Sequence, residues 1–252
     1  MTSTGRFSVA YIPREEFLER RFHWKPGEHV VVLAPTGWGK THLLYQLTDT
    51  AATERNPAYL LVLKPRDETV EKFRAKLGWP RTDRYPPPLY QRIQYGRFFR
   101  RGPKFRGLVV WPKHEFDPSK DDPHIGRIMR RAILHSYKKG NRIVVVDEAY
   151  SMGKEYGLDR EMVTVLSKGR SMETAMFGGS QKPTHIPLWF YSQSDHLFIG
   201  NDPDKRARQR YGEIGGVDPK LVEAEVSKLH KHEFLYIRRN GKNGPEIAVI
   251  GP

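Results

Sequence analysis

Short apolar runs alternate with amphipathic segments along most of the chain. β-Branched and aromatic residues dominate the apolar runs, which predict buried strands over residues 29–33, 58–63, 107–111, 142–146, 174–178 and 196–199. Apolar residues at helical spacing predict helices over residues 41–47, 67–77, 124–139, 159–168 and 186–192. Strands that alternate with helices are typical of a mostly parallel sheet covered by helices on both faces. The pattern therefore predicts an α/β fold.

The two ends of the chain differ from this alternation. Residues 1–27 are expected to form an N-terminal extension with a short helix near residues 15–22, which leaves residues 28–252 as a single domain. The Asn-Gly-rich link close to the C-terminus is typical of a hairpin turn. The elements predicted there are charged helices over residues 204–213 and 219–230 and a closing hairpin of strands over residues 234–238 and 247–250.

Residues 81–106 interrupt the alternation and are expected to form an insertion that is largely loop. They contain a triple proline, several aromatic residues and many arginines against the single acid Asp83. Basic groups in such a segment neutralise nucleic-acid phosphates, and its aromatic rings either stack on bases or anchor the loop on the domain. A solvated surface loop or a contact with a partner protein accounts for the same composition. The candidate DNA contacts are Arg97, Arg100, Arg101 and Lys104.

Charge and composition narrow the class of partner. The 252 residues carry a formal net charge of +14, with a sequence pI of about 9.9, which favours a polyanion such as nucleic acid. The absence of cysteine excludes disulfides and thiolate metal sites. No apolar run approaches the ~20 residues of a membrane span, and the charged N-terminal segment lacks the apolar core of a signal peptide. We expect an intracellular, cytoplasmic protein without a membrane anchor.

The segment Ala34-Pro-Thr-Gly-Trp-Gly-Lys-Thr41 fits the pattern G-x-x-x-x-G-K-[ST] of a phosphate-binding loop, with alanine in the first position. Its glycines allow successive N–H groups to point at phosphate oxygens, and the start of the following helix adds partial positive charge. A glycine-rich turn that matches by chance is the alternative, but a predicted strand precedes the segment and a predicted helix follows it. The residues expected to bind ATP are Ala34, Pro35, Thr36, Gly37, Trp38, Gly39, Lys40 and Thr41. Of these, Lys40 would reach the β- and γ-phosphates and the Thr41 hydroxyl would ligate Mg²⁺.

A pair of carboxylates, Asp147 and Glu148, directly follows the most apolar predicted strand. Active groups in open parallel sheets gather at the carboxyl ends of strands, so the pair is expected to face the phosphate-binding loop. Asp147 would hold Mg²⁺, and Glu148 would polarise an attacking water. A glutamate in this place favours hydrolysis over transfer to another acceptor. Two solvated carboxylates at a strand end are the structural alternative.

A third candidate, Gln181, follows the predicted strand over residues 174–178, at the end of the run Gly178-Gly179-Ser180-Gln181. A polar side chain on a strand between the two motif strands can contact both the γ-phosphate and the attacking water. Gln181 is therefore a candidate catalytic residue that couples hydrolysis to conformational change. A loop glutamine ahead of Pro183 is the alternative.

The order of these motifs resembles that of the FtsK-HerA superfamily of DNA-pumping P-loop ATPases. Lys168-Gly169-Arg170 corresponds to a basic element before the fourth core strand, Gln181-Lys182-Pro183 to a Gln-Arg-Pro-like tripeptide, and Ser192-Gln193-Ser194-Asp195 to a Ser-Gln-Ala-Asp-like segment. The resemblance covers residues 28–240, and the chain is most similar to viral genome-packaging members. Alanine at position 34 and the insertion over residues 81–106 depart from the family pattern.

The resemblance implies a three-layer P-loop NTPase (RecA/ASCE-like) domain with core strand order 5-1-4-3-2. It also implies a hexameric ring that hydrolyses ATP with Mg²⁺ and moves double-stranded DNA into a capsid. A portal or vertex protein of the capsid is the further partner that the resemblance implies. Such an enzyme would act in the host cytoplasm or on the virion. Arg170 takes the family's basic position and is the first candidate for a catalytic arginine supplied to the neighbouring subunit.

Other functions remain open from the residues alone. The same superfamily includes conjugative and chromosomal DNA-transfer ATPases. A monomeric P-loop kinase would use an Arg-rich lid, for which the candidates are Lys205, Arg206, Arg208 and Arg210. The arginines of that segment are also the reserve candidates for the catalytic arginine, since Arg170 has a surface or structural role as its alternative. A non-catalytic DNA-binding protein is disfavoured because the catalytic set is intact.

Overall fold

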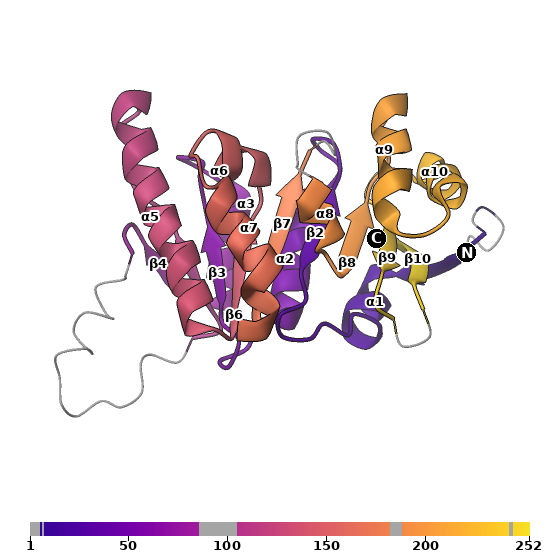
Figure 1. Ribbon diagram of the computed structural model, residues 1–252, viewed down its shortest axis with the longest axis horizontal. Coiled ribbons are helices and arrows are strands. Elements are labelled where there is room, and N and C mark those ends of the chain that lie inside the picture. Colours follow the sequence, from indigo (N-terminus) through magenta and orange to yellow (C-terminus); the bar gives the residue numbers. More distant parts are fainter. Residues whose placement is uncertain (1–5, 7, 86–104, 182–187, 242–243) are drawn as a thin grey trace.

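A computed structural model describes residues 6, 8–85, 105–181, 188–241 and 244–252. In this part of the chain, ten strands form one sheet in the order β1-β10-β9-β8-β2-β7-β6-β3-β5-β4 (Figure 1). The strands are β1 (Ala10–Pro13), β2 (Val30–Leu33), β3 (Ala58–Leu61), β4 (Arg81–Thr82), β5 (Gly107–Val110), β6 (Arg142–Val146), β7 (Thr174–Ser180), β8 (His196–Ile199), β9 (Phe234–Arg238) and β10 (Glu246–Gly251). The helices are α1 (Arg14–Arg20), α2 (Lys40–Ala51), α3 (Glu68–Leu77), α5 (Pro118–Lys139), α6 (Ala149–Lys154), α7 (Asp159–Lys168), the 3-10 helix η1 (Gly169–Met172), α8 (Leu188–Ser192), α9 (Lys205–Gly215) and α10 (Pro219–Ser227).

The sheet is mostly parallel. The strands from β8 through β2, β7, β6, β3 and β5 to β4 are parallel to one another, and β1 is parallel to β10. Among the described residues, only the pairs β8–β9 and β9–β10 are antiparallel. Numbered along the chain from the strand before the phosphate-binding loop, β8-β2-β7-β6-β3 has the order 5-1-4-3-2, as the resemblance implied. The antiparallel pair β9–β10 is the predicted C-terminal hairpin.

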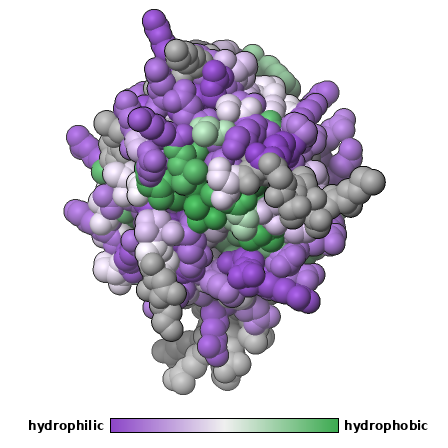
Figure 2. Space-filling view, turned by 90° about the vertical axis from the view of Figure 1, so that its right-hand side faces the viewer, coloured by the Kyte–Doolittle hydropathy of each residue, from purple (hydrophilic) through white to green (hydrophobic). Residues whose placement is uncertain are grey.

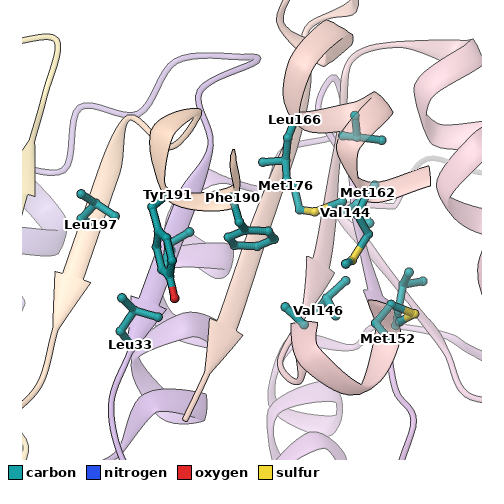
Figure 3. Packing of buried hydrophobic residues seen from close by; sticks show 14 of the residues in the cluster. Leu33, Val144, Val146, Met152, Met162, Leu166, Met176, Phe190, Tyr191 and Leu197 are labelled. Atoms are coloured by element: carbon teal, nitrogen blue, oxygen red, sulfur yellow. The ribbon is translucent and has the colours of Figure 1, made fainter. Parts of the chain in front are cut away.

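Helices cover both faces of the sheet because successive side chains of its strands alternate between two hydrophobic clusters. On one face, α5, α6, α7 and α8 pack on residues such as Val31 and Val144; on the other, α1, α2 and α3 pack on residues such as Val30 and Val145 (Figure 1). Figure 3 shows the first cluster, where Phe190 of α8 lies over the central strands. The predicted three-layer α/β fold is therefore confirmed.

The N-terminal segment joins the sheet instead of standing apart from it. β1 pairs in parallel with β10, with Ile12 opposite Ile250. Phe17 of α1 is fully buried, and its ring lies 4.7 Å from that of Tyr236 in β9. Residues 10–20, which the sequence analysis assigned to an extension, thus complete one side of the domain. Their partner strand lies more than 200 residues away, which no local pattern can show.

The β1 side of the sheet ends in a partly apolar surface. β1 and β10 carry the partly buried apolar residues Tyr11, Ile12 and Ile247. Figure 2 views this side of the molecule and shows an apolar area surrounded by hydrophilic residues. The first described strand, β1, and the last, β10, both lie on this side (Figure 1). The described part of the chain contains no helix that is long and apolar enough to cross a membrane.

Several element boundaries differ from the prediction. α5 begins at Pro118 instead of residue 124, because the Asp117 side chain accepts the Ser119 N–H at 3.1 Å and Pro118 occupies the first helical position. Pro123, the residue directly before the predicted helix, therefore lies inside α5. The short helix α6 directly after Glu148 was not predicted. β7 extends two residues further than predicted, to Ser180.

Candidate nucleotide-binding site

The phosphate-binding loop connects the carboxyl end of β2 to the start of α2. Gly37 and Gly39 have φ of 78° and 94°, in the left-handed region that a residue with a Cβ rarely adopts. Gly39 is the N-cap of α2 and provides no side chain for the cap, so the N–H groups of the first turn can bind an anion. The Ala34 N–H donates to the Ser180 carbonyl at 3.2 Å, which ties the loop to the end of β7.

Lys40 and Asp147 form a buried ion pair beneath this loop. The Lys40 ammonium donates to Asp147 Oδ1 at 2.5 Å and to the Asp147 main-chain oxygen at 3.0 Å. It also lies 3.7 Å from Glu148 Oε1. The two motif segments therefore meet at the carboxyl edge of the sheet, where the strand-end argument places them.

The Asp147 and Thr41 side chains fit a divalent cation. The Thr41 hydroxyl donates to Asp147 Oδ2 at 2.7 Å, so a carboxylate oxygen and a hydroxyl oxygen lie side by side next to the phosphate-binding loop. Oxygen donors of this kind are the ligands that Mg²⁺ prefers. Asp147 and Thr41 are therefore the residues that would hold the metal of a Mg²⁺–nucleotide complex.

Gln181 connects the phosphate-binding loop to the second carboxylate. Its Oε1 accepts the Thr36 hydroxyl at 3.0 Å, and its Nε2 donates to Glu148 Oε1 at 3.1 Å. The side chain follows β7, the strand between β2 and β6, and so reaches both motif strands. Lys182 and Pro183, the rest of the predicted tripeptide, lie outside the described residues.

An open cavity of about 380 Å³ contains most of these groups. Ala34 and Trp38 belong to the predicted loop but do not line it. Ala34 is fully buried, and the Trp38 indole N–H donates to the Glu233 carbonyl at 3.0 Å. The lining residues are Pro35, Thr36, Gly37, Gly39, Lys40, Thr41, His42, Lys64, Thr69, Glu148, Gln181 and His232. Burial and the neighbouring charges of Arg14, Lys76 and His232 hold the pKa of His42 below its usual value.

Sequence reasoning missed His42, Lys64, Thr69 and His232 as cavity residues. The first follows Thr41 directly in α2, so its place beside the loop was visible in the motif. Lys64 comes from the β3–α3 connection, Thr69 from the first turn of α3 and His232 from the segment before β9, and only the fold brings them to the loop. A larger cavity of about 780 Å³ lies between α5 and the α6–α7 connection and contains none of the motif residues.

The glycines at the end of β7 provide space for the site. A Cβ on Gly179 would lie 2.5 Å from the Asp147 carbonyl oxygen and 3.1 Å from Lys40 Nζ. A Cβ on Gly178 would instead meet the ring of Phe190 at 2.2 Å on the other face of the sheet. Gly179 therefore allows the Lys40–Asp147 pair to pack directly against β7.

In the folded subunit, Arg170 lies at the opposite edge of the sheet from this cavity. It belongs to η1, which leads into the amino end of β7, whereas the phosphate-binding loop lies at the carboxyl ends of the strands. Its guanidinium pairs with Asp195 Oδ1 at 2.5 Å; Arg170 is exposed, but the Asp195 carboxylate is only 1% exposed. Asp195 also accepts the His29 N–H at 2.9 Å and the Asn240 amide at 2.8 Å. Arg170 thus has a structural partner, and a role in a neighbouring subunit stays a prediction.

The arginines of α9 lie at the same edge of the sheet as the nucleotide cavity, because α9 follows the carboxyl end of β8. Arg208 donates to the carbonyls of Asp202 and Pro203 at 2.6 and 2.9 Å, and Arg210 pairs with Glu213 at 2.5 Å. Arg206 is exposed. Arg208 and Arg210 are therefore engaged within their own helix region.

The ends of the insertion contact the domain, and its middle lies outside the described residues, including Arg97, Arg100, Arg101 and Lys104. Tyr85 is buried, and its hydroxyl bonds to His135. Phe105 lies 6.1 Å from the ring of Tyr59. Arg106 donates to the Asp49 carbonyl at 2.7 Å. The described aromatic residues of the insertion thus anchor it on the domain.

No protein-family model and no curated protein matches the chain. Among solved structures, it is similar to the genome packaging NTPase B204 from Sulfolobus turreted icosahedral virus 2 in complex with sulfate, with a TM-score of 0.61 and 16% identity over 91% of this chain and 98% of that one. The complex of B204 with ATP-gammaS gives a TM-score of 0.57 and 16% identity, over 89% and 98% of the two chains. EssC (ATPases 2 and 3) from Geobacillus thermodenitrificans gives a TM-score of 0.50 at 9% identity, over 91% of this chain and 40% of that one. The chain therefore has the fold of the genome packaging NTPase B204, as the order of its motifs implied.

Proposed function

We propose that the chain is an ATPase that hydrolyses Mg²⁺-bound ATP and uses the cycle to move double-stranded DNA. The observation that carries this proposal is the connection from Thr36 through Gln181 to Glu148, beside the buried Lys40–Asp147 pair. It places a carboxylate, a lysine and a polar coupling residue around one phosphate-binding loop. The fold shared with the genome packaging NTPase B204, which has been solved with ATP-gammaS, supports the same function.

Each residue has a distinct role in the proposed hydrolysis. Lys40 exchanges its contact with Asp147 for the β- and γ-phosphates and neutralises their charge. Glu148 accepts a proton from the attacking water, and Gln181 orients Glu148 through its amide N–H. Asp147 and Thr41 would hold Mg²⁺, which would supply positive charge against the charge that develops on the phosphate oxygens. Gln181 also accepts a hydrogen bond from Thr36 in the phosphate-binding loop. Loss of the γ-phosphate would therefore shift Gln181, and with it both Glu148 and the end of β7.

We further propose that the working form is a hexameric ring that packages a viral genome. The net charge of +14 and the arginines of the insertion support a DNA substrate. Arg170, or an arginine of α9 in its place, would stabilise the transition state in the neighbouring subunit. Such an enzyme would act in the host cytoplasm, docked on a portal or vertex protein of the capsid. Conjugative or chromosomal DNA transfer uses the same chemistry and is the alternative within this class.

A monomeric kinase with an Arg-rich lid is the second candidate, and two observations disfavour it. The Glu148–Gln181 contact supports Glu148 as a base that would activate a water. Arg208 and Arg210 of the candidate lid are engaged with α9 and its neighbours. A kinase would transfer phosphate only to an added acceptor, whereas the proposed enzyme releases inorganic phosphate without one.

The direct experiment measures phosphate release with and without duplex DNA, together with the mass of the assembly. We expect DNA-stimulated hydrolysis by an oligomer. Lys40→Ala should lose tight ATP binding, whereas Glu148→Gln should bind ATP and fail to turn it over. Equal ATP affinity in Lys40→Ala and the unchanged protein would contradict the assignment of the site, and a monomer indifferent to DNA would contradict the translocase.

A further inference from the structure

His232 reaches the phosphate-binding loop from the segment between α10 and β9. Its φ of 72° lies in the left-handed region, which is uncommon for residues other than glycine and persists where the surroundings hold it in place. The surroundings here are two other parts of the chain. The Arg14 guanidinium of α1 donates to the His232 carbonyl, and the imidazole Nδ1 lies 2.9 Å from the main-chain oxygen of Trp38.

Trp38 and the segment before β9 hold each other through a reciprocal pair of hydrogen bonds. The Trp38 indole N–H donates to the Glu233 carbonyl at 3.0 Å, while the Trp38 carbonyl bonds to the His232 ring. Glu233 is in turn fixed by Arg6, whose Nη2 lies 2.5 Å from Glu233 Oε1. The position of His232 relative to the loop is therefore set by backbone groups on both sides.

The imidazole of His232 lies beside Gly39 in the phosphate-binding loop. His232 lines the same cavity as Lys40 and Thr41, and its Nδ1 would lie 2.9 Å from a Cβ on Gly39. In loops of this type the backbone N–H groups around the second glycine cradle the α- and β-phosphates. Gly39 thus permits both the left-handed turn and the close approach of the His232 ring.

The tautomer of His232 follows from its partner. A carbonyl oxygen only accepts, so Nδ1 carries the hydrogen in the bond to Trp38. Nε2 is then the polar atom of the ring that remains for a ligand. When protonated, Nε2 donates a charge-assisted hydrogen bond to a phosphate oxygen, which is the stronger kind of hydrogen bond.

We propose that His232 is a nucleotide-binding residue that contacts the α- or β-phosphate through Nε2. This inference rests on the proposed nucleotide site and adds to it a residue from the C-terminal part of the chain. It also implies that bound nucleotide joins the phosphate-binding loop to the segment before β9. The loop and that segment would then separate less easily in the nucleotide complex.

The test compares nucleotide affinity and turnover in two variants, because asparagine and glycine both tolerate a positive φ. In His232→Asn and His232→Gly we expect the dissociation constants of ATP and of ADP to rise by the same factor, about 10-fold or more for the loss of one charge-assisted bond. KM should rise with little change in kcat, since the contact is the same in the ground state and the transition state. Lys231→Ala is the matched control, because it removes a charge from an exposed neighbour that does not line the cavity.

Three outcomes would overturn the inference. Unchanged affinity for ATP and ADP in both variants would show that the ring does not contact the nucleotide. A loss confined to ATP would place any contact at the γ-phosphate. A fall in kcat with KM unchanged would show that His232 acts only by shaping the loop. If Lys40→Ala loses ATP binding while both His232 variants retain it, this inference fails and the proposed function stands.

Discussion

The most demanding test of the site is the substitution Gly179→Ala in β7. Gly179 lies between β2 and β6, opposite Val32, at the point where Asp147 follows the end of β6. A Cβ there would lie 2.5 Å from the Asp147 carbonyl oxygen, 2.9 Å from Asp147 Oδ1 and 3.1 Å from Lys40 Nζ. Carbon and oxygen atoms approach one another to roughly 3.3 Å, so the methyl group needs about 0.8 Å of movement. The nearest atom belongs to the backbone, which cannot rotate away.

The movement can be accommodated in two ways, and both are measurable. Inserting a methyl group into a packed region costs about 1–3 kcal/mol, which lowers the melting temperature of a protein of this size by roughly 2–12 °C. Displacing Asp147 relative to Lys40 and Thr41 affects catalysis, since an error near 1 Å in a catalytic group costs ~10²-fold in rate. We therefore expect kcat for ATP hydrolysis to fall by about 10- to 100-fold in Gly179→Ala.

Gly178→Ala is the matched control. Its methyl group would meet Phe190 at 2.2 Å on the opposite face of the sheet, so it should lower stability without displacing Asp147. Phosphate release and thermal unfolding are measured for both variants, at a temperature where each is folded. A Gly179→Ala protein that is folded and hydrolyses ATP within twofold of the unchanged protein would refute the reasoning. So would an equal loss of kcat in Gly178→Ala.

Three further predictions concern other parts of the chain. Burial of His29 lowers its pKa to about 4 from 6.5, so the unfolded chain binds the proton first and the free energy of unfolding should fall by about 3 kcal/mol as the pH drops from 6.5 to 4. Denaturant titrations should show a smaller fall in His29→Asn, and an equal fall would contradict this. If Arg170 acts on the neighbouring subunit, mixing Arg170→Ala with Glu148→Gln should restore part of the ATPase activity, whereas no activity from a co-assembled mixture would exclude that role. If the insertion follows the DNA backbone, replacing its arginines with alanine should weaken the salt dependence of DNA affinity, by about one unit of slope for each phosphate contact removed; the residues to replace are Arg97, Arg100 and Arg101. An unchanged slope would favour a contact between the insertion and a partner protein.

The sequence by itself determined the centre of the fold and most of the site. The phosphate-binding loop, Asp147 and Glu148 follow short apolar strands, and parallel strands bring their carboxyl ends to one edge. The contacts of Lys40 with Asp147 and of Gln181 with Glu148 lie at that edge. The fold prediction succeeded because each strand is a local pattern, and one rule of sheet geometry brings these residues to the same edge. The catalytic roles of the residues stay predictions.

The tertiary structure alone decided which distant residues complete the site. β1 pairs with β10, and His232 and Glu233 meet Trp38, across nearly the whole length of the chain. The role of Gly179 depends on the packing of Asp147 and Lys40 against it, which its position in a strand does not show. Arg170 was a candidate catalytic arginine from the order of the motifs, yet it pairs with Asp195 near the amino end of β7, away from the nucleotide cavity. Such contacts depend on the order of the strands in the sheet. The sequence does not reveal them, because the side chains involved are not part of a periodic hydrophobic pattern.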